Sequence, residues 1–367
     1  MINRIRGVLF GLLLFASALL GAVFLLTPFI PLMFISPPKW RFFADRFVGY
    51  WLTFPASLCY LLFGAKFHVS GDLIDRKEPA LMVLNHRTRL DWLFFWTALY
   101  KMDPWLLVSE KILLKASLKF LPGAGWAMQC ASYLFLERKY EFDRMLMGET
   151  ISYYCRCGNP YQLLLFPEGT DRSESALEKS NDYARANNLP CYKHILHPRT
   201  KGFSFLVQDM LRKKYIRYVY DITVGYPKGV VCEEIDILKK GLFPSEIHFH
   251  IKKYNIEDLP ADDEEEISNW LCNLWRDKEH CLDQFYSKNK MFTPSGDQYV
   301  WPVETTGIGY TCALMFWTTS SIFWIYITYL YLAVKYYFFF SCLFYIFCQK
   351  FFGGIDTLAL KLSARAF

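Results

Sequence analysis

The sequence lacks several features that define other classes of protein. It contains no Gly-x-Ser-x-Gly motif, the turn that carries the nucleophile of α/β-hydrolases; the segment from Gly202 to Phe205 lacks the second glycine. No dense block of lysine and arginine with interleaved aromatics is present, so no nucleic-acid partner is expected. An Asn-x-Ser/Thr sequon is also missing, which agrees with a chain that faces the cytosol.

Cysteines are present but do not form a recognisable pattern. There are 11 of them, an odd number, and several lie in apolar stretches. Cys155 and Cys157 form the only close pair, and no second pair or histidine spacing completes a zinc site. We therefore expect reduced thiols and no metal.

Charge is missing from two long N-terminal stretches. The run Gly7–Pro38 has 32 uncharged residues, whereas about 20 span a bilayer, and it is too long for a signal peptide. A second run covers Phe47–Ala65. Basic residues flank the first run on both sides, so they do not orient it. A hairpin that dips into one leaflet keeps these cations on one side, and we prefer it to two crossings.

The C-terminal part is similarly apolar. Thr305–Val334 has 30 uncharged residues rich in aromatics and is the strongest transmembrane candidate. Tyr336–Gln349 adds 14 more, which either extend past Lys350 as a full span or form a re-entrant segment. We expect three parts: membrane-embedded segments over residues 1–65, a globular domain over 66–304 and membrane segments over 305–367.

The middle part alternates between strand and helix patterns. The expected strands are Phe67–Val69, Ala80–Leu84, Tyr133–Leu136, Gln162–Phe166, Ile222–Tyr226 and Ile247–Ile251. The expected helices are Asp91–Tyr100, Glu110–Phe120, Phe142–Cys157, Asp182–Asn187 and Phe205–Lys213. This alternation predicts an α/β fold, a mixed, largely parallel sheet with helices packed on it, flanked by the membrane-embedded helices.

His86 and Asp91 are candidates for acid–base chemistry. On one continuous helix, residues five apart would point about 140° away from each other. A strand that ends at Leu84 and a helix that begins near Asp91 let the loop bring them together. A neutral imidazole oriented by a carboxylate is a general base. The alternative is an ordinary loop histidine beside a helix cap.

A second polar turn follows the apolar run Leu163–Phe166. Glu168 and Gly169 lie just beyond it, and ligands of open α/β sheets bind at the carboxyl ends of strands. If this strand is a parallel neighbour of the one that ends at Leu84, His86 and Glu168 open into one crevice. The alternative is a simple Pro-Gly turn.

Several cations could contact phosphate groups. Arg138 ends another short apolar run, where a guanidinium can bind phosphate through two hydrogen bonds. Lys111, Lys115 and Lys119 are spaced by four residues, so on a helix they would share a face toward anionic lipid or remain a solvated basic face.

Taken together, these segments resemble the glycerolipid acyltransferases, the 1-acylglycerol-3-phosphate acyltransferases and their relatives. His86 and Asp91 match the H-x4-D block of that family, and Phe166–Thr170 matches its F-P-E-G-T block. Phe135–Arg138 resembles the second block, and Pro198 stands where the fourth is expected. The likeness is closest to the lysocardiolipin acyltransferase branch, over Asn85–Trp92, Lys115–Lys119, Gly125–Gln129, His197–Thr200 and Ile247–His250.

One position departs from the family pattern. Many members carry arginine directly after E-G-T, where it is expected to hold the acceptor phosphate, but here Asp171 follows Thr170. An aspartate cannot pair with phosphate. We therefore expect the headgroup to be held differently, by Arg172, Arg199 or Lys201, which makes plain lysophosphatidic acid a less favoured acceptor.

The resemblance implies acyl transfer from acyl-CoA, as a co-substrate and without a cofactor, to a glycerol hydroxyl of a lysophospholipid. The expected acceptors are of the lysocardiolipin, lysophosphatidylinositol or lysophosphatidylglycerol type. His86 would act as the base and Asp91 would orient it. The expected substrate-binding residues are Arg138, Glu168, Gly169, Thr170, Arg172, Arg199 and Lys201.

Three alternatives remain open. They are phosphatidic acid synthesis, a CoA-independent transacylase with the same catalytic pair, and a non-enzymatic membrane protein. The last would place ionisable residues inside its apolar spans, and the spans before Lys335 have none. Because acyl-CoA is kept on the cytosolic side, the resemblance also implies a multi-pass or re-entrant protein of the endoplasmic reticulum membrane, with its catalytic domain facing the cytosol.

Overall fold

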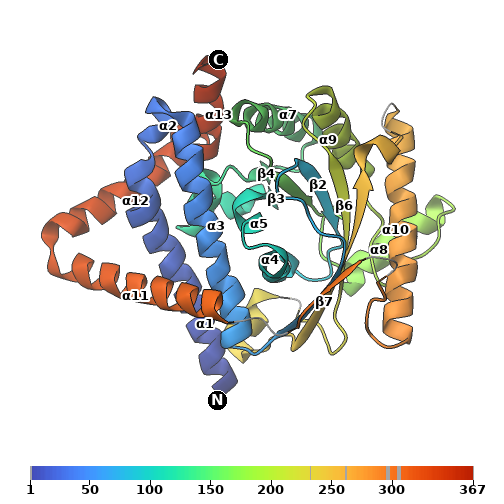
Figure 1. Cartoon of the computed structure of the whole chain (residues 1–367). Coiled ribbons are helices and arrows are strands. Elements are labelled where there is room, and N and C mark those ends of the chain that lie inside the picture. Colours follow the sequence, from blue (N-terminus) through green and yellow to red (C-terminus); the bar gives the residue numbers. More distant parts are fainter. Residues whose placement is uncertain (1, 232, 261–262, 295–297, 304–306, 367) are drawn as a thin grey trace.

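The computed structural model describes residues 2–231, 233–260, 263–294, 298–303 and 307–366. Within these ranges one sheet lies at the centre of the molecule (Figure 1). Its strands are β1 Lys66–Gly71, β2 Ala80–Leu84, β3 Glu110–Lys115, β4 Leu134–Leu136, β5 Gln162–Leu165, β6 Tyr218–Gly225, β7 Glu246–Asn255 and β8 Tyr299–Trp301. They lie side by side in the order β4-β3-β5-β2-β6-β7-β1-β8.

Helices surround this sheet and form both ends of the chain. The α-helices are α1 Ile2–Gly21, α2 Leu32–Ile35, α3 Pro37–Leu61, α4 Asp91–Met102, α5 Leu106–Ser109, α6 Ala124–Cys130, α7 Tyr140–Cys157, α8 Glu174–Ala186, α9 Thr200–Arg212, α10 Glu264–Ser287, α11 Ile308–Leu330, α12 Leu332–Phe352 and α13 Ile355–Ala366. Short 3-10 and π turns are η1 Ala22–Leu26, η2 Thr27–Phe29, η3 Ala116–Phe120, η4 Asp236–Lys240 and η5 Ile256–Asp258.

The strand directions confirm a mixed, largely parallel sheet. Strands β4, β3, β5, β2 and β6 run parallel to one another. Strand β7 is antiparallel to β6 but parallel to β1, and β8 pairs antiparallel to β1 at the edge. Because β2 and β5 are parallel neighbours, with Val83 opposite Leu165, the loops after both strands leave the sheet at the same edge.

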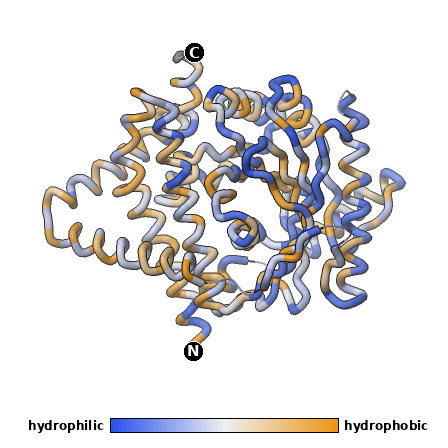
Figure 2. The backbone as a smooth tube through the Cα atoms, in the orientation of Figure 1, coloured by the Kyte–Doolittle hydropathy of each residue, from blue (hydrophilic) through white to orange (hydrophobic). Residues whose placement is uncertain are grey.

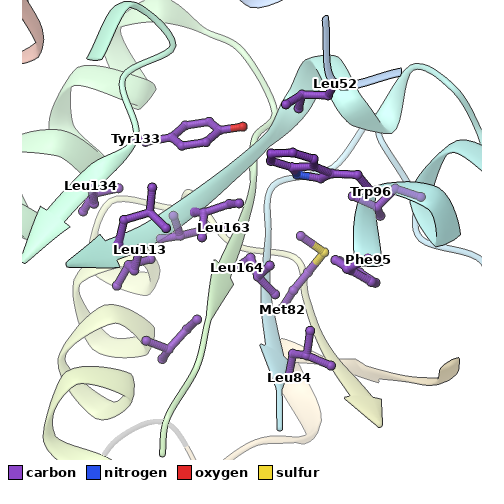
Figure 3. Packing of buried hydrophobic residues seen from close by; sticks show 14 of the residues in the cluster. Leu52, Met82, Leu84, Phe95, Trp96, Leu113, Tyr133, Leu134, Leu163 and Leu164 are labelled. Carbon is purple, nitrogen blue, oxygen red and sulfur yellow. The ribbon is translucent and has the colours of Figure 1, made fainter. Parts of the chain in front are cut away.

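The core lies on both faces of the sheet. Every residue of β2 is buried, as expected for a strand covered on two sides. In Figure 3, Met82 of β2 lies between Leu164 of β5 and Phe95 of α4. Helix α4 covers one face, where Phe95 packs on Phe249 of β7, and α10 covers the opposite face, where Phe285 contacts His248.

The prediction of a helix over Glu110–Phe120 is wrong. This segment forms β3, followed by the 3-10 turn η3. Pairing with β5 on one side and β4 on the other buries Ile112–Leu114, and this burial outweighs a helical spacing of lysines. The expected basic helix face is therefore wrong too. Lys111 is buried against Asp45, and Lys119 pairs with Asp356.

The terminal helices form the apolar part of the molecule. Helices α11 and α12 make a hairpin that projects away from the sheet (Figure 1), and Figure 2 shows this hairpin and α1 to be mainly hydrophobic. Among the residues that the structure describes, three helical stretches are long and apolar enough to cross a membrane: Ile2–Ile35, Ile308–Leu330 and Leu332–Phe352. The stretch Leu332–Phe352 includes the expected apolar run Tyr336–Gln349 and extends it through Phe352. The expected boundary between the globular domain and the C-terminal membrane segments, at residues 304 and 305, lies outside the described residues. The start of the apolar run at Thr305 therefore lies outside them too.

Helix α3 carries the second N-terminal apolar run but differs from these candidate spans. It packs against α4, α5 and α11, and its Arg41 and Asp45 side chains are buried. Arg41 and Asp45 therefore face protein, whereas Lys39 and Arg46 are exposed. Helix α3 thus joins α1 and α11 to the α/β domain.

Candidate active site

The structure brings His86 and Asp91 together as expected. Strand β2 ends at Leu84 and α4 begins at Asp91, so the loop between them reverses over a few residues. His86 Nδ1 lies 3.0 Å from Asp91 Oδ2. The Thr88 backbone N–H donates to the same oxygen at 2.8 Å, which fixes the loop around the carboxylate.

Two residues that the sequence analysis did not single out hold this pair in place. The Tyr226 hydroxyl donates to the other oxygen of Asp91. Tyr226 follows β6, the neighbour of β2, so its place at the carboxyl end of a strand was the signal that could have identified it. The Asn85 side chain bonds both backbone groups of Val224, at 2.8 and 3.2 Å, and locks the end of β2 to β6.

The hydrogen bond to Asp91 determines which imidazole nitrogen is free. An ionised carboxylate only accepts hydrogen bonds, so Nδ1 of His86 carries the proton and Nε2 keeps its lone pair. No hydrogen bond from the described residues reaches Nε2. The ring packs on Phe166 at a centroid distance of 4.3 Å, and 16% of the side chain is exposed.

Charges around the ring oppose the effect of its burial. Desolvation disfavours the imidazolium, but the hydrogen bond and charge of Asp91, with the charges of Glu168 and Asp171, raise the pKa of His86 above its ordinary value. The imidazole is thus a stronger base than a free histidine. With an open nitrogen, this arrangement can remove a proton from a hydroxyl group.

The Glu168 side chain connects the loop that contains His86 to the segment that contains Leu196, and it does not project into solvent. Its Oε1 accepts the backbone N–H of His86 and its Oε2 that of Leu196, each at 3.0 Å. Only 3% of the residue is exposed, and burial raises the pKa of its carboxyl group to about 7. Its expected contact with substrate stays a prediction, and the geometry adds a positioning role.

Two arginines lie beside the turn at Gly169. Gly169 has φ +74°, and its carbonyl accepts a hydrogen bond from Arg138 at 3.0 Å. A Cβ here would lie 3.2 Å from Nε of Arg199, so glycine lets that side chain lie close to the turn. Arg138 and Arg199 are both exposed, and Thr170 follows the same turn. This grouping can hold an anionic phosphate.

The other two expected cations are placed differently. The Arg172 guanidinium donates to the carbonyl of Lys193 and to Glu174, and 11% of its side chain is exposed. Lys201 is exposed in the first turn of α9, 5.7 Å from the ring of Tyr140. Arg172 therefore has partners within the protein, whereas Lys201 remains open to a ligand.

Comparison with known proteins gives consistent matches. An acyltransferase family model matches residues 66–227, and a model of the acyltransferase C-terminus matches residues 236–315. "Lysocardiolipin acyltransferase 1" of Gallus gallus is 40% identical over 97% of this chain and 94% of its own length. "Lysophosphatidylinositol acyltransferase 10" of Caenorhabditis elegans is 41% identical, over 97% and 93%. "Probable 1-acyl-sn-glycerol-3-phosphate acyltransferase 5" of Arabidopsis thaliana is 31% identical, over 78% and 75%.

Proposed function

The chain belongs to the acyltransferase family that includes the lysocardiolipin acyltransferases, and from this premise we propose that it acylates lysophospholipids with acyl-CoA as the donor. The acceptors we propose are lysocardiolipin, lysophosphatidylinositol or lysophosphatidylglycerol. Relatives named for the first two support this choice. So does Asp171, since an aspartate after the F-P-E-G-T turn removes one expected phosphate ligand.

The observation that carries the proposal is the 3.0 Å contact between His86 Nδ1 and Asp91 Oδ2, which leaves Nε2 as a base. Nε2 takes the proton of the acceptor hydroxyl, whose oxygen attacks the thioester carbonyl carbon. The carbon–sulfur bond then breaks, and the CoA thiolate takes the proton from the imidazolium. Asp91 stabilises the imidazolium, as the carboxylate does in a catalytic triad. General-base catalysis of this kind supplies roughly 10²–10⁴ in rate.

The cations beside Gly169 support an anionic headgroup. Arg138 and Arg199 are exposed and lie next to the turn that follows β5. The loops after β2 and β5 leave the same edge of the sheet, so a phosphate here brings the neighbouring glycerol toward His86. Holding both reactants in one crevice supplies the proximity that such reactions require.

A panel of lysophospholipids with labelled acyl-CoA tests the proposal. Purified protein should form a labelled phospholipid with one more acyl chain than the acceptor and release one CoA thiol per product, with His86→Ala as the inactive control. Preference for lysophosphatidic acid would favour phosphatidic acid synthesis. Labelled transfer from a phospholipid without CoA would favour a transacylase, and the absence of product with every lysolipid would contradict the proposal.

We further propose that the catalytic domain faces the cytosol at the endoplasmic reticulum membrane. The apolar helices support membrane attachment, and the exposed Cys191 offers a test of orientation. An impermeant maleimide added to sealed microsomes should label wild type but not the control Cys191→Ser at this site. Labelling of Cys191 only after detergent would place the domain in the lumen.

A further inference from the structure

Three possible metal ligands converge on strands that do not carry the candidate active site. His68 lies on β1, and Glu246 and His248 lie on β7. The two strands run parallel with His68 opposite His248, so both imidazoles project from the same face. Glu246 shares this face because it precedes His248 by two residues. Phe285 of α10 packs against His248 and identifies it as the face under α10.

The ligand atoms of these three residues point at one place. His68 Nε2 lies 3.2 Å from Glu246 Oε1, and His248 Nε2 lies 3.0 Å from the same oxygen. The two rings stack with centroids 4.1 Å apart. The possible ligand atoms lie within 4.8 Å of one another. Two imidazole nitrogens and one carboxylate oxygen thus surround a single position.

We propose that His68, Glu246 and His248 bind one Zn²⁺ ion, with the fourth position open to water. Tetrahedral zinc takes bonds of about 2.0–2.2 Å to these atoms, which sets neighbouring ligand atoms about 3.4 Å apart. The two contacts observed need to open by only a few tenths of an ångström. His68 and Glu246 have 23% and 16% of their side chains exposed, so the ion has a path from solvent.

The surroundings of Glu246 suit this role. Lys228 Nζ holds the second carboxylate oxygen, Oε2, at 2.6 Å, which orients the carboxylate and leaves Oε1 for the ion. Such outer contacts are typical of metal-binding carboxylates. The two nitrogen ligands disfavour Mg²⁺ and Ca²⁺, which prefer oxygen ligands.

The ion would join two parts of the chain that are distant in sequence. His68 lies in the segment that matches the acyltransferase family model, whereas Glu246 and His248 lie in the segment that matches its C-terminal companion. Zinc motifs that can be read from sequence have closely spaced ligands, so this site gives no sequence signal. Bound zinc would fix β1 to β7 and stabilise the fold; it makes no contact that the proposed acyl transfer requires.

Metal titration of the full-length, tag-free protein in detergent tests the proposal. After removal of metal with a chelator, the protein should take up one equivalent of Zn²⁺ from a chelator-buffered solution and melt at a higher temperature. His68→Gln and Glu246→Gln should each weaken binding at least about 10-fold, since changes even in outer contacts cost 10- to 100-fold. The control His280→Gln alters an exposed histidine elsewhere and should bind like wild type.

Cobalt distinguishes this site from adventitious binding to cysteine. Co²⁺ at a His/His/Glu site should give the visible absorption of tetrahedral cobalt without a sulfur charge-transfer band. The partly exposed His68 makes its variant the less disruptive one, and its melting without metal shows whether it folds. The proposal would be overturned if wild type failed to bind zinc, if both variants bound zinc as tightly as wild type, or if a thiolate band appeared. A hydrogen-bonded His–Glu–His cluster would then remain.

Discussion

Two groups of buried charges differ in what they leave open. The first, which we call the edge cluster, consists of His86, Asp91 and Glu168. The second, which we call the inner cluster, consists of Arg41, Asp45 and Lys111. The edge cluster lies where β2 and β5 end, and its imidazole is 16% exposed. The inner cluster lies between α3 and β3, where each of its three residues is at most 4% exposed.

The inner cluster directs its bonds toward other parts of the protein. Asp45 accepts from Lys111 at 2.9 Å and from the Tyr161 hydroxyl at 2.6 Å, and Arg41 lies 3.8 Å away. Arg41 also donates to the side chain of Ser132. These contacts connect α3 to the sheet. The comparison indicates different roles for the two clusters. The charges of the inner cluster pair with one another and stabilise the fold, whereas the edge cluster contains a base with one free nitrogen that can react.

The largest effect is expected for His86→Ala in the edge cluster. Removing the base should lower kcat/KM by roughly 10²–10⁴, because that is what general-base catalysis contributes. The melting temperature should stay close to that of wild type, since the imidazole is partly exposed and bonds one neighbour through its side chain. Initial rates and melts of the purified variant measure both. A variant that keeps more than about a tenth of the wild-type rate would contradict the role of His86 as the base.

Lys111→Met should produce the opposite pattern in the inner cluster. Removing one partner of a buried ion pair costs about 3–5 kcal/mol, because the other charge is left unpaired in a poorly solvated place. Unfolding should become easier by that amount, while the folded fraction keeps its kcat. The matched control is Lys115→Met at the exposed end of the same strand, which should change little. If Lys111→Met were as stable as wild type but lost activity, the conclusion that the inner cluster stabilises the fold without taking part in catalysis would be contradicted.

The inner cluster also shows where sequence reasoning stops. The edge loops were predictable because H-x4-D and F-P-E-G-T follow apolar strands, so parallel pairing alone brings them together. Lys111 was misassigned because lysines four apart also fit a helix, and its partner Asp45 lies on a helix remote in sequence. Burial of β3 between two strands outweighed local spacing. Tyr226 was missed because a hydroxyl donor to a carboxylate has no spacing rule.

Glu168→Gln tests whether the edge cluster also contains a purely positioning residue. A glutamine has one carbonyl oxygen for the two N–H groups that the carboxylate accepts, and its NH₂ group would face a donor. An unsatisfied buried donor costs about 1–3 kcal/mol. We expect kcat and the melting temperature to fall together, with the exposed Glu178→Gln as the unaffected control. An unchanged melting temperature with a raised KM would instead support direct contact with substrate.

The smallest and most specific effect is expected in the pH dependence of kcat/KM, which reports groups of the free enzyme. His86 acts when unprotonated, and Asp91 raises its pKa despite burial, so activity should be lost as pH falls through a value above 6.5. Asp91→Asn removes the charge but keeps the burial, so the midpoint should move to lower pH, because the imidazolium loses the charge that raises the pKa of His86. The plateau rate should also fall, because the imidazolium formed in the reaction loses its partner.

Glu168, with a pKa of about 7, titrates in the same range, and Glu168→Gln separates the two groups. If the acidic limb disappears in Glu168→Gln but stays in place in Asp91→Asn, it belongs to Glu168, and the raised basicity of His86 is contradicted.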